Sequence, residues 1–144
     1  MLICTIGFSK KSLRDFVGKL RDAGVEKLVD VRLNNTSQLA GYAKKQDLEY
    51  VLELVGIQYE HLPELAPTEK LLKDYKGKKV SWDEYEATFN NLLGERNPFE
   101  LLNLDQGPEV ICLLCSEDKP RNCHRRLVAE YIQSNKEGVE IMHL

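Results

Sequence analysis

Residues 110–115 read Val-Ile-Cys-Leu-Leu-Cys, and this stretch decides the fold. Every side chain in it is apolar or a thiol, which is typical of a central parallel strand that helices cover on both faces. The polar segment 116–122 then leads into a helix that Gly138 ends, and residues 139–144 predict a last strand. Parallel strands joined through a helix form right-handed crossovers, so this part of the chain predicts a parallel α/β sheet.

The residues before this stretch repeat the alternation of strand and helix. Apolar runs predict strands at 2–6, 28–32 and 57–61, and the helices that follow the first two end at Gly24 and Gly56. We therefore predict a Rossmann-like three-layer α/β sandwich with a mostly parallel five-stranded sheet.

Residues 63–80 interrupt this alternation. They contain two prolines, a glycine and scattered lysines, so we expect a surface excursion with the least regular structure of the chain. A capping box at 81–84 predicts the start of the next helix, and Asn97-Pro98 predicts a short helix after it. We interpret residues 1–144 as a single α/β domain that carries this excursion.

The composition is that of an ordinary globular chain without a strong charge. Its 144 residues include 20 Lys or Arg and 23 Asp or Glu, which gives a formal net charge of −3. This balance argues against a general nucleic-acid coat, although a local basic patch is compatible with it. No apolar run approaches the about 20 residues of a membrane span, and the N-terminus lacks the basic and cleavage regions of a signal peptide. We expect no membrane partner, a cytoplasmic location and four reduced cysteines.

Ligands of parallel α/β sheets bind beyond the carboxyl ends of the strands. The residues in or just beyond the carboxyl-terminal parts of the predicted strands are Gly7, Phe8, Ser9, Asp30, Arg32, Asn34, His61 and 115–125. Many of the chemically capable side chains of the chain are among them. Asp30 and Arg32 share one strand face, so they either form a structural salt bridge or present a carboxylate and a guanidinium to a ligand.

Cys115 closes a predicted strand, and Cys123 opens the helix behind it. Free backbone N–H groups at a helix start and neighbouring cations stabilise a thiolate, so either cysteine is a candidate low-pKa thiol, and we expect Cys123 to react with iodoacetamide faster than an ordinary thiol. The alternative is a pair of half-buried structural cysteines. Cys112 and Cys115 lie on opposite faces of a strand, which argues against a redox-active C-x-x-C pair.

Two other kinds of site are compatible with the same segment. Residues 115–121 have the C-x-x-x-x-x-R spacing of phosphatase loops, but two acidic residues and a proline in the loop oppose phosphate binding. A zinc or iron site would use Cys115, Cys123 and His124 with a distant histidine. If both are helical, adjacent Cys123 and His124 diverge by about 100°, so we assign no metal site.

Four segments of the chain carry a family pattern: TIGFS (5–9), LVDVR (28–32), GIQYEHLPEL (56–65) and LLCSEDKPRNCHRRLVAEYI (113–132). Together they resemble the uncharacterised family catalogued as domain of unknown function 488, from Cys4 to Leu144. The resemblance implies a compact α/β domain, and some relatives carry labels that link them to DNA repair. It also implies a set of motif residues: Thr5, Gly7, Ser9, Asp30, Arg32, His61, Cys115, Glu117, Cys123, His124 and Arg125.

One position departs from the family pattern. The family usually has an arginine shortly after the V-D-V-R run, and this chain has Gln38 there. If that arginine binds an anion in relatives, this protein has lost a charge and a pair of donors. Its ligand would then differ or bind more weakly.

Two classes of function follow from the motif residues. The first is an enzyme that acts on a small anionic or nucleotide-like substrate, with chemistry carried by Cys115, Glu117, Cys123 and His124, and with the remaining motif residues binding the ligand. The second is a non-catalytic nucleic-acid-binding module related to DNA repair. The basic residues are divided among 10–14, 70–79 and 121–126, which need not form one face for a duplex. No cofactor and no oligomeric state follow from the sequence.

Overall fold

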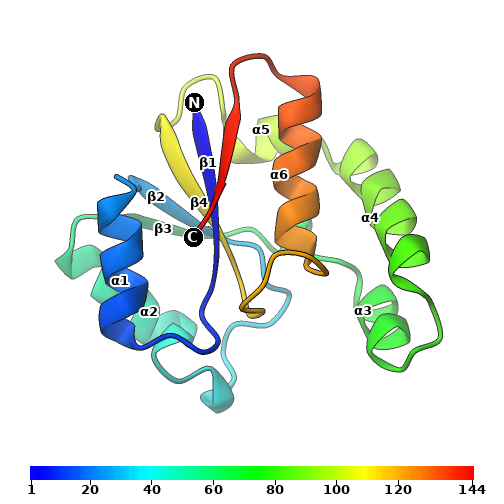
Figure 1. Cartoon of the computed structure of the whole chain (residues 1–144), viewed down its shortest axis with the longest axis horizontal. Coiled ribbons are helices and arrows are strands. Elements are labelled where there is room, and N and C mark those ends of the chain that lie inside the picture. The colour runs from blue at the N-terminus through cyan, green and yellow to red at the C-terminus, as the bar shows by residue number, and fades with distance from the viewer.

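The α/β fold is confirmed by the computed structural model, which describes all residues from 1 to 144. Five strands form one sheet in the order β3-β2-β4-β1-β5, and every neighbouring pair is parallel (Figure 1). The strands are β1 (Leu2–Gly7), β2 (Lys27–Asp30), β3 (Gln58–His61), β4 (Val110–Cys115) and β5 (Glu140–His143). Each strand lies where an apolar run predicts it, with end points that differ by two residues at most.

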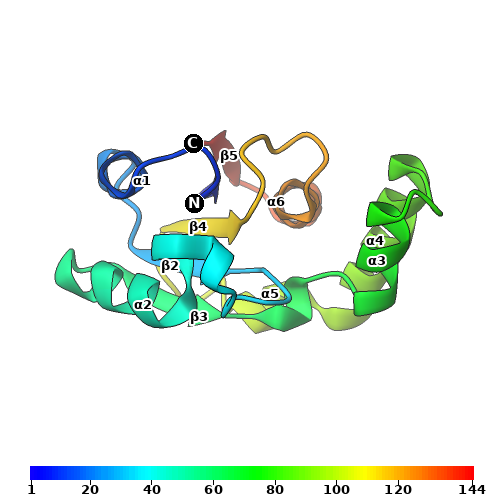
Figure 2. The same ribbon diagram turned by 90° about the horizontal axis from the view of Figure 1, so that it is seen from below.

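Helices cover both faces of the sheet and complete the three layers. They are α1 (Leu13–Asp22), α2 (Lys45–Leu54), α3 (Glu69–Lys76), α4 (Trp82–Arg96), α5 (Pro98–Leu102) and α6 (His124–Asn135), with short 3-10 helices η1 (Gln38–Ala43) and η2 (Pro63–Leu65). Figure 2 shows α1 and α2 on one side of the sheet and α6, α4 and α3 on the other. None of the helices combines the length and the apolar character that a bilayer crossing requires.

The central strand β4 is apolar because both of its faces are buried. Cys112 and Leu114 pack with the apolar residues of α1 and α2, whereas Ile111 and Leu113 pack with those of α4, α5 and α6. Full burial of a leucine side chain is worth about 1.5–3 kcal/mol. The alternation of β4 side chains between two cores therefore holds the three layers together.

The segment 63–80 is more regular than the sequence predicts. It contains η2 and α3, and the Thr68 side chain accepts a hydrogen bond from the backbone N–H of Leu71 at 3.1 Å to begin α3. Leu65 and Leu71 are buried in the same core as α4. The expectation of irregular structure is wrong, because prolines and lysines are compatible with helices here. Pro63 begins η2, and the lysines of α3 lie on the side of the helix that faces solvent.

The carboxyl ends of the parallel strands lie at one edge of the sheet, and the segments that follow β1 and β4 contact each other there. Beyond β1, the N–H of Phe8 donates to the carbonyl of Cys115 at 3.3 Å, and that of Ser9 donates to the carbonyl of Ser116 at 3.2 Å. The segments that follow β1 and β4 therefore run side by side. This contact places the start of α6 over the edge of the sheet.

Candidate functional site

A pocket of about 340 Å³ lies at this edge, beyond the ends of β2 and β4. Its volume is within the usual range for a small-ligand site. Five of the residues predicted for the site line the pocket: Arg32, Cys115, Glu117, Cys123 and His124. The other predicted residues are elsewhere: Thr5, Gly7, Ser9, Asp30, His61 and Arg125 do not line it.

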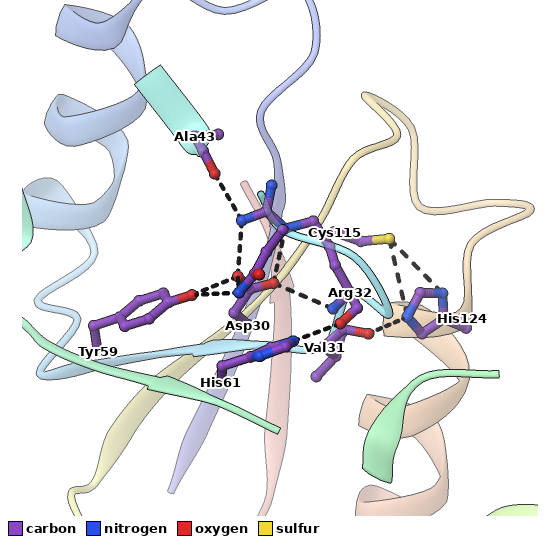
Figure 3. Close-up of polar contacts among 9 residues, drawn as sticks. Asp30, Val31, Arg32, Ala43, Tyr59, His61, Cys115 and His124 are labelled. Carbon is purple, nitrogen blue, oxygen red and sulfur yellow. Dashed lines mark hydrogen bonds and ion pairs between the residues drawn. The ribbon is translucent and has the colours of Figure 1, made fainter. Parts of the chain in front are cut away.

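Cys115, Cys123 and His124 form a buried cluster at the base of the pocket. Their side-chain donor atoms all lie within 4.8 Å of one another. The sulfur of Cys115 is 3.7 Å from Nδ1 and 4.0 Å from Nε2 of His124 (Figure 3). Nε2–H of His124 donates to the carbonyl of Val31 at 2.6 Å, so in the neutral ring the lone pair is on Nδ1.

The two thiols of the cluster are coupled. A hydrogen bond from Cys123, together with backbone N–H groups of Ser116 and Glu117, lowers the pKa of Cys115 although burial opposes this effect. Donation to Cys115 and burial both raise the pKa of Cys123. The sequence leaves a low-pKa thiol open at either cysteine and predicts that Cys123 is reactive, whereas these two directions give Cys115 the lower pKa of the pair.

The loop between β4 and α6 is held by Arg125, whose side chain does not face the pocket. Arg125 is 1% exposed, and its guanidinium donates to the carbonyls of Glu117 and Asp118. Gly7 permits the same arrangement, since a Cβ there would lie 1.6 Å from the carbonyl oxygen of Glu117. Both residues therefore shape the loop that carries Glu117, and neither is in a position to touch a ligand in this pocket.

Asp30 is the centre of a buried polar network. It accepts hydrogen bonds from Nε and Nη2 of Arg32 at 2.8 and 2.7 Å, from the hydroxyl of Tyr59 at 2.7 Å and from the side chain of Asn35 at 3.3 Å (Figure 3). Burial alone would raise the pKa of Asp30, but the hydrogen bonds and charge of Arg32 outweigh it and lower the pKa. Of the two readings of this pair, the structure favours the salt bridge. Nη2 of Arg32 also donates to Ala43, while Nη1 has no hydrogen-bond partner within the protein.

The remaining predicted residues have structural contacts. The hydroxyl of Thr5 lies 2.6 Å from Nδ1 of His143 on the neighbouring strand. His61 donates from Nε2 to the carbonyl of Arg32 at 2.8 Å. Gln38 is exposed at the start of η1 and does not line the pocket.

One wall of the pocket is aromatic and was not predicted. Tyr75 comes from α3, and Trp82 and Tyr85 come from the first turn of α4. The rings of Trp82 and Tyr85 stack with centroids 5.0 Å apart, and those of Tyr75 and Trp82 are 5.6 Å apart. The available sequence signal is the concentration of aromatic residues between 75 and 89.

A more open hollow adjoins the pocket and shares Trp82 and Asn122 with it. Arg121 and Arg126 complete its lining. Arg126 lies 5.9 Å from the ring centre of Trp82 and pairs with two glutamates. Arg121 is exposed and forms no ion pair, so its guanidinium is available to an anion in the hollow beside the pocket.

These features define a parallel α/β protein with a buried thiol and imidazole cluster under a pocket at the carboxyl edge of its sheet. The chain belongs to the family described as Domain of unknown function DUF488, which matches residues 12–132. The match includes the aromatic wall and the cysteine and histidine cluster, and it confirms the family resemblance, while TIGFS (5–9) lies outside the matched range. No curated protein and no solved structure matches the chain.

Proposed function

We propose that the protein is an enzyme that binds a small, planar, anionic ligand of the nucleotide type and acts on it with the cluster of Cys115, Cys123 and His124. The observation that carries this proposal is that an aromatic wall and the buried cluster line one pocket, and that the unpaired Arg121 lines the hollow that adjoins it. Small-molecule sites typically combine apolar walls with a few polar groups that orient the ligand. This pocket has that character.

The walls suit a flat ring that carries a negative charge. A base that stacks on an aromatic side chain such as Trp82 gains about 1–3 kcal/mol. The guanidinium of Arg121, in the hollow beside the pocket, suits a phosphate or carboxylate because it can donate two parallel hydrogen bonds. Arg32 also lines the pocket, and we infer that its Nη1, which has no partner in the protein, is a second donor to the ligand.

This surface is less suited to binding a nucleic-acid duplex. Two of the cations near the site are already paired: Lys11 pairs with Asp118 at 2.8 Å, and Arg126 pairs with two glutamates. The net charge of the chain is −3. Duplex binding depends on many unpaired cations that contact successive phosphates, so these features favour a small ligand.

The single tryptophan of the chain offers a direct binding test, because Trp82 lines the pocket. We expect a nucleoside monophosphate to quench its fluorescence with saturation, and the matching nucleoside and inorganic phosphate to bind more weakly. Arg121→Ala should weaken the monophosphate at least tenfold. Arg14→Ala, which removes an exposed cation from α1 on the other side of the sheet, should leave binding unchanged.

Catalysis is tested separately from binding. The bound monophosphates are incubated with the protein and the mixture is analysed for products by mass spectrometry. Cys115→Ser should keep the fluorescence response and lose product formation. If no small ligand quenches Trp82 while an oligonucleotide binds in a manner that depends on salt, the enzyme proposal is wrong and the nucleic-acid module replaces it.

A further inference from the structure

The three side chains at the base of the pocket have the donor types of a metal site. We propose that Cys115, Cys123 and His124 bind one zinc ion through two sulfurs and Nδ1, and that the fourth coordination position faces the pocket. Thiolate and imidazole donors together suit zinc, whereas magnesium and calcium prefer oxygen. The role of the fourth position rests on the proposed function, but zinc binding itself rests on the cluster alone.

The spacing of the cluster is close to that of a zinc site. Bonds of about 2.3 Å to sulfur and about 2.0–2.1 Å to nitrogen place tetrahedral ligand atoms about 3.5–3.8 Å apart. The sulfur of Cys115 is 3.7 Å from Nδ1 of His124, and all three donor atoms lie within 4.8 Å. The sulfur lies nearly as close to Nε2, at 4.0 Å, so coordination requires a turn of the imidazole that aims Nδ1 at the ion.

The backbone removes the objection that the sequence raises against joint binding by neighbouring residues. Cys123 is the residue before α6, and its φ of −134° and ψ of 137° are extended, while His124 is the first residue of the helix. Their side chains therefore do not follow the divergence of two consecutive helical positions. The donor atoms of both lie within 4.8 Å of the sulfur of Cys115.

Contacts around the cluster are of the kind that orient metal ligands. A metal-binding histidine usually donates its other N–H to a carbonyl or carboxylate, and here Nε2 of His124 donates to the carbonyl of Val31 at 2.6 Å. Nη1 of Arg125 lies 3.5 Å from the sulfur of Cys123 and offsets thiolate charge. These contacts position both ligands from outside the coordination sphere.

Three protein ligands are the number found at catalytic zinc sites, in which water or substrate takes the fourth position. All three residues line the pocket, so that position is reachable from the aromatic wall. A structural site would instead be closed by a fourth side chain. The inferred ion is therefore accessible to the ligand that the pocket holds.

The test uses the full chain, stripped with a chelator, kept under a phosphine reductant and titrated with zinc against a chromophoric zinc indicator. We expect one zinc per chain, no competition from magnesium, and sulfur-to-metal charge-transfer absorption when cobalt replaces zinc. Cys115→Ser, Cys123→Ser and His124→Gln should each weaken zinc binding by about 100-fold or more, since even outer contacts are worth about 10–100-fold. Cys112→Ala and His61→Gln are matched controls outside the cluster and should bind zinc as the parent does.

A second measurement needs no substitution and therefore does not depend on the folding of variants. Zinc should protect Cys115 and Cys123 of the parent chain from alkylation, as read by peptide mass spectrometry. Absence of a one-to-one complex, or equal zinc affinity in the three cluster variants, overturns the metal site. Quenching of Trp82 fluorescence by a nucleotide in the stripped protein would then still support the proposed function. Zinc binding without any response to nucleotides would instead refute the proposed nucleotide ligand and leave the zinc site standing.

Discussion

Replacement of Asp30 by asparagine tests how strongly the buried network holds the edge of the sheet. Asp30 is fully buried and accepts five hydrogen bonds, three of them from Arg32, which is 3% exposed. Asp30→Asn keeps the shape of the side chain but leaves the guanidinium charge buried without a counter-ion. Removal of one partner of a buried ion pair costs about 3–5 kcal/mol, and we expect this loss in the free energy of unfolding. In a domain of this size it corresponds to a melting temperature lower by about 10–20 °C.

Urea unfolding, followed by circular dichroism and by tryptophan fluorescence, measures the loss. Asp118→Asn is the matched control, because it removes a carboxylate from a partly exposed pair with Lys11 and should cost about 0–1 kcal/mol. A double variant, Asp30→Asn with Arg32→Met, should recover much of the stability because no buried charge is left unpaired. A loss below about 1 kcal/mol in Asp30→Asn would refute the reasoning. A loss in the double variant equal to the summed losses of Asp30→Asn and Arg32→Met, each measured alone, would also refute it.

Three further outcomes are expected. Gly7→Ala should destabilise the protein by about 1–3 kcal/mol in urea unfolding, since its Cβ would meet the carbonyl of Glu117. Gly18 in α1 has open space where a Cβ would lie, so Gly18→Ala should be neutral or stabilising. Phe89→Ala should cost about 3–5 kcal/mol by the same measurement, because this ring is completely buried between α4 and α6; a loss under 1 kcal/mol would contradict its place in the core. The pKa of Asp30 is lowered in the folded state, so its contribution to the free energy of unfolding is complete above the unfolded-state pKa of about 3.9 and is lost as pH falls through the folded pKa. The melting temperature of the parent should therefore decrease when the pH is lowered below about 4. A melting temperature that stays constant in this range would contradict the assignment.

The strands and most helices could be predicted because their signals are local. A continuous apolar run such as 110–115 indicates burial on both faces, and a capping box such as 81–84 indicates a helix start, wherever the rest of the chain lies. The order β3-β2-β4-β1-β5 has no such signal, because it depends on which apolar faces fit together after the crossovers form. The regular structure of 63–80 was missed for the same reason, since its buried leucines become recognisable only against α4.

The sequence by itself determined which side chains gather at the carboxyl edge, because parallel strands all end there and the residues that follow them are known from the chain. Only the tertiary structure decided the part that each one plays. Asp30 and Arg125 can be buried because other segments supply the partners that a buried charge requires. The aromatic wall comes from α3 and α4, far from Cys115 in the sequence, and it lines the pocket because α4 packs against α6 and α3 packs against α4. Side-chain direction and surroundings depend on such long-range contacts, which local patterns do not encode.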